Sequence, residues 1–411
     1  MANVSSSNGL EKRPKLRFPG FDGPIKSAHL SQYLVENKER NKNLIYTKSD
    51  VLSVSGEYGI VNQIEFQGRS FAGESVAEYH VVETNDIVYT KSPLKANPYG
   101  IIKVNNGAPG IVSTLYAVYH PCEGTVAEYI DYYFGNDLRL NKYLKPLVNI
   151  GAKHDMKVNN ETVLTGEVYF PGYSEQKKIV GFLTILDERI RQQRNLVEAL
   201  KKYKRGVMQK VFRNMSAFSP SGFETVRLSD IFKKVYRRNS NGEIKNVITN
   251  SAEHGLIPQR DFFDKDIAVD GNTGNYYVIE YGDFVYNPRK SNTAPYGPFN
   301  RYERQEKGII SPLYTCLVLK ADIEPAYLAW YFKSDAWYRY IYDNGSQGVR
   351  HDRVSMTDDL LMGMPVIIPS KDSQIKIAKL LDCLEKRFQV ELSQCEYLKT
   401  VREALLQQLF I

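Results

Sequence analysis

The sequence contains few cysteines. Only four occur among 411 residues, and no two of them form a CxxC pair. They are Cys122, Cys316, Cys383 and Cys395. This count argues against a disulfide framework and against a cysteine-rich zinc site, and it fits a reducing cytoplasm.

Long hydrophobic runs are also missing. The sequence has no stretch of about 18 apolar residues, the length that a transmembrane helix needs. Residues 1–18 lack the apolar centre of a signal peptide. We therefore expect no membrane partner, and we interpret residues 1–27 as an N-terminal segment outside the main domains. A length of 411 residues exceeds one ordinary core, so two or more domains are expected.

Nucleotide and methyl-donor motifs are absent. No GxGxxG loop follows an expected strand, and no GxxxxGK[ST] loop occurs. An adenine methyltransferase would need Asn or Asp followed by Pro-Pro-aromatic, but Asn97-Pro98-Tyr99 lacks the second proline and is typical of a turn. We expect neither ATP nor S-adenosylmethionine to bind this chain.

Metal-binding patterns are weak. A magnesium nuclease could use a carboxylate with Glu-x-Lys, but charged residues make up 25% of the chain, so loose matches arise by chance. Such matches are Asp22, Glu36 and Lys38, and Asp230, Glu243 and Lys245. No HExxH pair occurs among the six histidines. His154 and His351 occupy matching positions of the repeat, but two histidines are too few ligands for a metal site. We therefore predict no metal and no catalytic site in this chain.

An internal duplication is the clearest feature of the sequence. Segments separated by 196 to 198 residues match in order along most of the chain. Examples are SGEYGIVNQ (55–63) with SAEHGLIPQ (251–259), NDIVY (85–89) with GDFVY (282–286), GIVSTLY (110–116) with GIISPLY (308–314), and GAKHD (151–155) with GVRHD (348–352). Because each copy is as long as a domain, the pattern predicts two similar domains and excludes a solenoid of short repeats.

Each copy has a globular part, residues 28–172 and 222–370. Short alternating apolar segments such as 86–90 and 283–287 indicate strands, and residues 126–136 and 325–334 indicate helices. We predict an α+β fold with two similar mixed domains.

Each globular part is followed by a long helix, at residues 173–213 and 371–411. Apolar residues recur there at heptad spacing, which predicts a coiled-coil seam. The seam residues are Ile179, Leu183, Leu186, Ile190, Val197 and Leu200, and Ile377, Leu381, Leu384, Phe388, Leu398 and Leu405. Polar residues interrupt both seams at equivalent places, Gln193 and Lys204 in the first helix and Glu391 and Arg402 in the second. We expect an antiparallel coiled coil that joins the domains, with two separate amphipathic helices as the alternative.

The two helices differ in charge. Residues 174–213 contain eleven Lys or Arg and four Asp or Glu, whereas residues 371–411 contain seven and six. The first helix could lie near a phosphate backbone, or it could have an ordinary solvated face.

The sequence resembles the specificity subunits of type I restriction–modification enzymes. KLRFPGFDG (15–23) is similar to that family's N-terminal phrase, and PGYSEQKKIVGFLTILDERI (171–190) is similar to its Pro-x-x-x-Glu-Gln-x-x-Ile junction. LKKYKRGVMQKVF (200–212) is similar to the end of its first conserved helix. The second copy is a weaker match, with Ser373 where the first has Glu175.

The resemblance implies a function and a set of partners. It implies two target recognition domains that read a bipartite site in double-stranded DNA, in a bacterial or archaeal cytoplasm. It also implies two modification subunits that methylate adenine and restriction (motor-nuclease) subunits that join for cleavage and defence against phage. S-adenosylmethionine, ATP and magnesium would belong to those partners, so this chain itself would be non-catalytic.

Basic and polar loop residues are the candidates for DNA contacts, because base edges are read by donors and acceptors while phosphates attract cations. The candidates are Lys91, Lys95, Lys153 and His154 in the first domain, and Arg289, Lys290, Arg350, His351 and Arg353 in the second. Arginine can bind guanine bidentately, which favours Arg289 and Arg350 as base readers. Each of these residues could instead be a solvated loop charge.

Two other readings stay open at this stage. A fused restriction–methylation enzyme would show the catalytic motifs that are missing. A coiled-coil interaction protein that never touches DNA, or a silent specificity chain kept for domain shuffling, would have the same sequence features.

Overall fold

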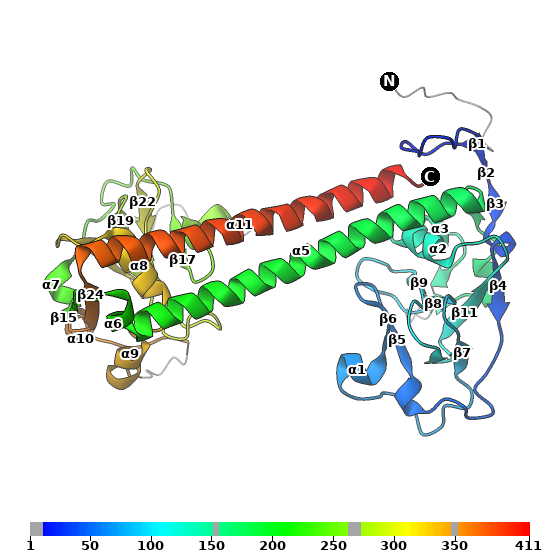
Figure 1. Ribbon diagram of the computed structural model, residues 1–411, viewed down its shortest axis with the longest axis horizontal. Helices are drawn as coiled ribbons and strands as arrows, with labels where there is room; N and C mark the ends of the chain where they lie inside the picture. The colour runs from blue at the N-terminus through cyan, green and yellow to red at the C-terminus, as the bar shows by residue number, and fades with distance from the viewer. Residues whose placement is uncertain (1–10, 151–155, 262–272, 347–351) are drawn as a thin grey trace. The chain divides into compact units, whose positions relative to one another are not determined.

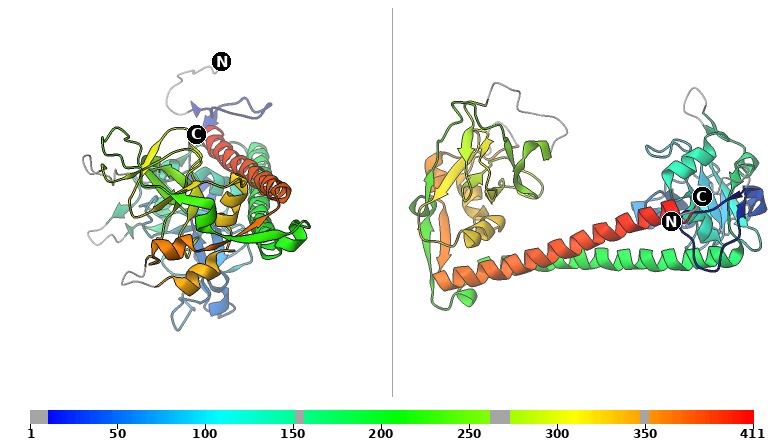
Figure 2. Two further views of the ribbon diagram at one scale, coloured as in Figure 1. Left: turned by 90° about the vertical axis from the view of Figure 1, so that its left-hand side faces the viewer. Right: turned by 90° about the horizontal axis from the view of Figure 1, so that it is seen from above.

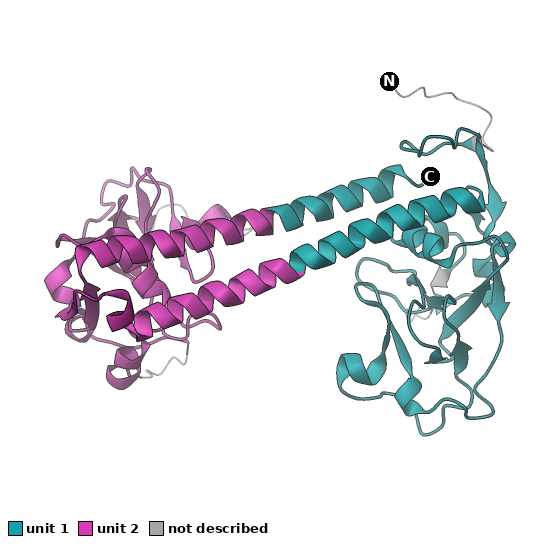
Figure 3. Ribbon diagram, in the orientation of Figure 1, with its two compact units in different colours: residues 1–194, 394–411 teal, residues 195–393 magenta. Residues whose placement is uncertain are grey.

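The computed structural model describes residues 11–150, 156–261, 273–346 and 352–411. It divides into two compact units, unit 1 (residues 1–194 and 394–411) and unit 2 (residues 195–393) (Figure 3). Helices α5 (Tyr173–Arg213) and α11 (Lys371–Gln408) each contribute a segment to both units. Within the described residues, no helix is both long enough and apolar enough to cross a membrane.

Unit 1 is built around a four-stranded antiparallel sheet. Its strands, in spatial order, are β4 (Leu34–Asn37), β11 (Tyr116–Pro121), β8 (Ile87–Thr90) and β9 (Ile102–Val104). The two-stranded pairs are β5 (Leu52–Ser55) with β6 (Gly59–Asn62), β7 (His80–Val82) with β10 (Gly110–Val112), and β3 (Ala28–His29) with β14 (Glu167–Val168). Helices α2 (Ala127–Phe134) and α3 (Asp137–Leu144) follow the sheet.

Unit 2 repeats this arrangement. Its four-stranded sheet has the order β16 (Phe232–Lys234), β23 (Thr315–Leu319), β20 (Phe284–Tyr286) and β21 (Phe299–Arg301). The pairs are β17 (Ile248–Ser251) with β18 (Gly255–Pro258), β19 (Tyr277–Ile279) with β22 (Gly308–Ile310), and β15 (Phe223–Arg227) with β24 (Pro365–Pro369). Helices α8 (Pro325–Lys333) and α9 (Tyr338–Asn344) follow (Figure 1). The α+β fold with two similar halves predicted from the sequence is thereby confirmed.

The remaining described elements are short. In unit 1 they are β1 (Glu11–Lys12), β2 (Ile25–Lys26), α1 (Gln63–Gln67), β12 (Asn149–Ile150), β13 (Met156–Lys157) and α4 (Asn160–Val163). In unit 2 they are α6 (Met215–Phe218), α7 (Leu228–Ile231) and α10 (Asp358–Met362).

Equivalent hydrogen bonds stabilise both copies. The Asn41 side chain bonds to both backbone groups of Tyr46, and the Asn239 side chain bonds to both backbone groups of Ile244. A buried asparagine side chain thus supplies hydrogen-bond partners to the backbone of the same loop in each copy, because buried backbone groups need partners.

The core of each unit is continuous with the long helices. In unit 1, Ile179 and Leu183 of α5 pack in one cluster with Leu406, Leu409 and Phe410 near the end of the chain. In unit 2, the equivalent cluster joins Val211 and Phe212 of α5 to Ile377 and Leu381 of α11. In each unit an end of one helix therefore packs with the opposite end of the other, so they are antiparallel, and the views of Figure 2 show them side by side.

The N-terminal segment takes part in unit 1. The backbone N–H of Leu16 donates to the carbonyl of Gln408 at 3.0 Å. In unit 2, the N–H of Asn214 donates to the carbonyl of Lys210 at 3.1 Å. Leu16 and Gln408 are the equivalents of Asn214 and Lys210 at a displacement of 198 residues. The same hydrogen bond therefore forms in both units. In unit 1 it joins two distant parts of the chain, and in unit 2 it lies within one continuous segment.

Candidate DNA interface and helical framework

In unit 1 the two long helices are joined by an ion pair. The Arg402 Nε of α11 lies 2.5 Å from the Asp187 Oδ1 of α5. The Tyr132 hydroxyl of α2 donates to the other Asp187 oxygen at 3.0 Å. One carboxylate therefore ties α11 and the globular domain to α5.

In unit 2 an equivalent pair joins the same helices. The Lys204 Nζ of α5 lies 2.5 Å from the Glu385 Oε2 of α11. Lys204 and Arg402 are equivalent residues of the two copies, and so are Asp187 and Glu385. The two polar interruptions Lys204 and Arg402 of the predicted seam are thus cations that pair with an acid on the opposite helix.

The proposed seam residues all lie on the inner side of their helices. None of them is exposed, and Leu183 and Leu381 have no accessible surface. Those with at most 6% of their surface accessible are Ile179, Leu183, Ile190, Val197, Ile377 and Leu381; Leu186, Leu200, Leu384, Phe388, Leu398 and Leu405 are half-buried. Gln193 is also buried, at 4% exposure, and Glu391 is half-buried. Burial of this side leaves the opposite faces of both helices available to other molecules.

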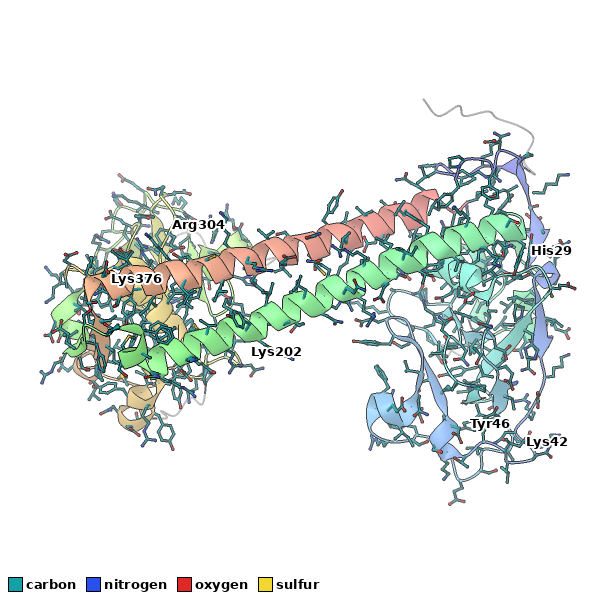
Figure 4. The ribbon with its side chains drawn as sticks, viewed as in Figure 1. His29, Lys42, Tyr46, Lys202, Arg304 and Lys376 are labelled. Carbon is teal, nitrogen blue, oxygen red and sulfur yellow. The ribbon has the colours of Figure 1, made fainter. Side chains whose placement is uncertain are left out.

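The exposed side of α5 has both charged and apolar residues. Lys202 is one of its exposed cations (Figure 4). Five large apolar side chains are also exposed: Tyr173 at the start of the helix, and Phe182, Ile185, Leu196 and Tyr203, of which Ile185 is the most accessible at 73%. The separations of Phe182, Ile185, Leu196 and Tyr203 are 3, 11 and 7 residues, which are sums of three- and four-residue steps, so these four form a second stripe beside the seam. Helix α11 exposes Leu380, Val390 and Tyr397 at corresponding heptad positions.

Three of the DNA-contact candidates lie together in unit 2. Arg289 and Arg353 face each other in an antiparallel bridge, and the N–H of Lys290 donates to the carbonyl of Asp352 at 2.8 Å. The Asp352 carboxylate lies 3.7 Å from the Arg289 guanidinium and 3.9 Å from that of Arg353, too far for strong pairing. The Arg289 side chain is 66% exposed. The fold therefore presents two arginines side by side, available to an anionic partner.

Tyr314 lies beside these arginines. Burial raises the pKa of its hydroxyl, and the nearby charges of Arg289 and Arg353 oppose that increase. The tyrosine therefore stays a neutral hydrogen-bonding group at physiological pH.

The candidates in unit 1 have different surroundings. Lys95 is exposed, whereas Lys91 is half-buried, and its pKa is lowered by burial and by Arg40 while Glu36 opposes this. Its neighbour His80 is 2% exposed, and its Nδ1 atom has no hydrogen-bond partner. Burial, followed by the charges of Arg40 and Lys91, lowers the pKa of His80 to about 4.

Four of the candidates lie outside the described residues. They are Lys153, His154, Arg350 and His351. Their contacts with DNA stay predictions.

The repeat contains one further pair of cations that we did not select from the sequence. Arg40 and Arg238 are equivalent, and each precedes the buried asparagine of its copy. Arg40 donates to the carbonyl of Glu78 at 2.9 Å, and Arg238 lies 3.3 Å from the Asn275 side chain. Their presence in both copies is the sequence feature that could have identified them.

The motif fragments rejected as catalytic have structural contacts. The Asn97 side chain donates to Asp137 at 2.9 Å, and its backbone closes a turn with Leu94. Asp230 accepts from the backbone N–H of Arg227 at the start of α7. Across the part of the chain that the structure describes, no group of three or more His, Cys, Asp or Glu could hold a metal ion.

Unit 2 also contains a cleft of about 1050 Å³ between the β17–β18 hairpin, α8 and the two long helices. The ion pair of Lys204 and Glu385 lines it, together with Arg301, Glu303 and Lys333. Cations and anions line it in similar numbers, so its charge favours neither an anionic nor a cationic ligand.

Comparisons with known proteins identify the fold. No protein-family model matches the chain, and no curated protein matches it. The crystal structure of a type I restriction–modification system S subunit from M. genitalium is 14% identical, with a TM-score of 0.54, and the match covers 97% of this chain and 99% of that one. A structure described under complex assembly and conformational transition of the type I R-M system is 16% identical, with a TM-score of 0.56 and the same coverage. The chain therefore shares its fold with these proteins along nearly its whole length.

Proposed function

We propose that this chain is the specificity subunit of a type I restriction–modification system. Each globular domain would read one half of a bipartite site in double-stranded DNA, and the chain would direct adenine methylation and restriction by partner subunits. The observation that supports this most directly is the end-to-end similarity to an S subunit, which includes both domains and both helices. The duplication adds independent support, because two similar domains suit two half-sites.

The polar groups of unit 2 suit DNA reading. Arg289 and Arg353 are adjacent, and the Asp352 carboxylate lies 3.7 Å from the first and 3.9 Å from the second. Arginine can bind guanine at two atoms and can also neutralise phosphate. We therefore propose that this edge of the domain faces the DNA.

Chemistry would reside in the partners. The chain has no nucleotide-binding or methyl-donor motif, so we propose that S-adenosylmethionine, ATP and magnesium bind to modification and restriction subunits. The purified chain alone should neither methylate nor cut DNA. Turnover by homogeneous protein with S-adenosylmethionine or magnesium would contradict this.

The modification subunits would dock along the exposed stripe of α5 and α11. Ile185→Asp should abolish assembly in a pull-down without loss of folding, because Ile185 is 73% exposed. Leu186→Asp should impair both folding and assembly, because it places a charge in the seam. Asn195→Asp, on the face away from the seam, is the matched control. Normal assembly of Ile185→Asp would show that the stripe is not the docking surface.

Methylome sequencing tests the proposed function directly. Cells that express this chain with its modification subunit should methylate adenines within one bipartite sequence. Exchange of residues 28–170 for the equivalent domain of a relative should change one half of that sequence only. Methylation that does not depend on this chain, together with no gel shift of DNA by the complex, would favour a coiled-coil protein that does not read DNA.

A further inference from the structure

Exposed apolar side chains of the globular domains generally differ between the two copies. Val35, Ile45 and Leu94 are exposed in unit 1, and the equivalent residues in unit 2 are polar. Those polar residues are Lys233, Glu243 and Ser291. Likewise, Tyr236 and Tyr281 are exposed in unit 2, and their equivalents in unit 1 are the polar residues Lys38 and Thr84. Single exposed apolar residues are ordinary on protein surfaces, and their loss in the other copy fits that reading.

Leu115 and Leu313 are the exception. They occupy equivalent positions and are 65% and 59% exposed. Among globular-domain residues described in both copies, they form the only identical pair of exposed large apolar side chains. Leu115 and Leu313 lie in the matching segments 110–116 and 308–314. A leucine that stays exposed in both copies, while other exposed apolar residues of the domains differ, indicates a contact with something outside the chain.

Both leucines are held in the same tight turn. The N–H of Tyr116 donates to the carbonyl of Ser113 at 3.0 Å, and the N–H of Leu115 lies 3.4 Å from the Ser113 hydroxyl. In unit 2 the corresponding distances to Ser311 are 3.1 Å from Tyr314 and 3.3 Å from Leu313. The backbone is therefore fixed by the serine, and the leucine side chain projects without a packing role.

Cations lie next to both turns. In unit 1, Tyr116 pairs with Thr90 in the sheet, which places Leu115 beside the strand end that continues into Lys91. In unit 2, Leu313 lines a small depression with Lys234, which is ion-paired to Asp358 there. The charges of Arg289 and Arg353, which Asp352 pairs only at long range, act on Tyr314 of this turn. An apolar tip flanked by cations suits DNA, where phosphates surround the apolar faces of stacked bases.

We propose that Leu115 and Leu313 are wedges that press against a base step in the half-site of their own domain. This inference rests on the proposed function and goes beyond it, since it assigns a DNA-deforming residue to each domain. Leucine is one of the side chains that DNA-bending proteins insert between bases, which partly unstacks a step. Such unstacking would help an adenine methyltransferase, which must turn its target base out of the duplex.

The test uses the full chain with its modification subunits and the methylated site found in cells. The duplex carries 2-aminopurine, a base whose fluorescence rises on unstacking, at successive positions of each half-site. The wild-type complex should raise fluorescence at one step in each half. Leu115→Ala should abolish the increase in one half only, and Leu313→Ala in the other only.

Affinity provides a second readout. Each alanine variant should bind the site about tenfold more weakly, because burial of a leucine side chain is lost. The salt dependence of binding should not change, since no phosphate contact is removed. Arg289→Ala, in contrast, should reduce the salt dependence if that arginine contacts phosphate.

Leu138→Ala is the matched control. Leu138 is 81% exposed, and its equivalent is Ala336, so its removal should change neither fluorescence nor affinity. The wedge proposal is overturned if Leu115→Ala and Leu313→Ala behave like this control. It is also overturned if they prevent subunit assembly, which would place the leucines against protein. If the wild-type complex fails to bind its methylated site at all, the proposed function itself is wrong.

Discussion

The two copies pair their long helices through the same two positions. In unit 1, Asp187 of α5 binds Arg402 of α11, and in unit 2, Lys204 of α5 binds Glu385 of α11. Each helix thus has one acid and one cation, placed so that an antiparallel partner satisfies both. The acids and cations have changed type between the copies, but their charges and positions have not. Because the ends of the two helices share one core in each unit, a change in one helix affects both.

Some polar contacts elsewhere differ between the copies. Buried Asp86 binds His120 in unit 1, whereas its equivalent Asp283 binds Arg237 in unit 2. Glu175 at the start of α5 binds Arg17, whereas its equivalent Ser373 bonds to Ser370. The ion pairs between the long helices have been kept, whereas a contact within the domain and the contact of Glu175 at the domain end of α5 have changed. This is the division expected if the domains recognise different half-sites on a common support.

The largest effect should come from changing the length of one helix and not the other. One heptad inserted after Leu196 alone would leave only one of the two ion pairs able to form, and it should disrupt assembly. Heptads inserted after both Leu196 and Gln394, which are equivalent positions, would restore both pairs and the seam register. Gel filtration with the modification subunit distinguishes the two variants.

The double insertion also tests the proposed function. Each helix grows by about 10.5 Å, the rise of about three base pairs of DNA. The unread spacer of the methylated sequence should lengthen by about that amount, with both half-sites intact. An unchanged spacer from an active double variant would show that the helices do not set it.

Glu175→Ser makes unit 1 resemble unit 2. Glu175 is 3% exposed, and both of its oxygens lie 2.7 Å from the Arg17 guanidinium. Loss of one partner of such a pair should lower the free energy of unfolding by about 3 kcal/mol. Urea denaturation measures the change. Ser373→Ala is the control, and an effect of equal size in both variants would contradict the difference that we draw between the units.

His80→Phe should remove a pH-dependence that the equivalent position of unit 2, Tyr277, does not have. The pKa of His80 is about 4 in the folded protein, below the ordinary value of 6.5. The unfolded chain therefore binds a proton between pH 6.5 and 4 that the folded chain does not, so stability falls as pH falls through this window. The contribution should be about 1–2 kcal/mol between pH 7 and pH 5.

Urea titrations at the two pH values measure this difference. The reciprocal variant Tyr277→His places a histidine at the equivalent, 9% exposed position and should introduce a similar dependence. If wild type and His80→Phe lose the same stability on acidification, the histidine is not the source.

The smallest effect concerns the two ion pairs. Double-mutant cycles to alanine at Asp187 and Arg402, and at Lys204 and Glu385, should each give a coupling of about 1 kcal/mol. The side chains are 21–35% exposed, so water screens part of the attraction. A coupling energy in one pair and none in the other would show that the two ion pairs are not energetically equivalent.

The sequence by itself determined the duplication, the α+β class and the heptad seams. These features depend on residues close together in the chain or on direct comparison of two segments, so periodicity and matching are enough to find them. The tertiary structure decided which charges meet. It placed Arg289 against Arg353, 64 residues further on, and it buried His80 beside Arg40 and Lys91. It also showed that Leu115 and Leu313 are exposed, although the surrounding residues read as ordinary strand. Burial and electrostatics depend on segments brought together by folding, and one sequence permits many such pairings, so these contacts followed only from the packed chain.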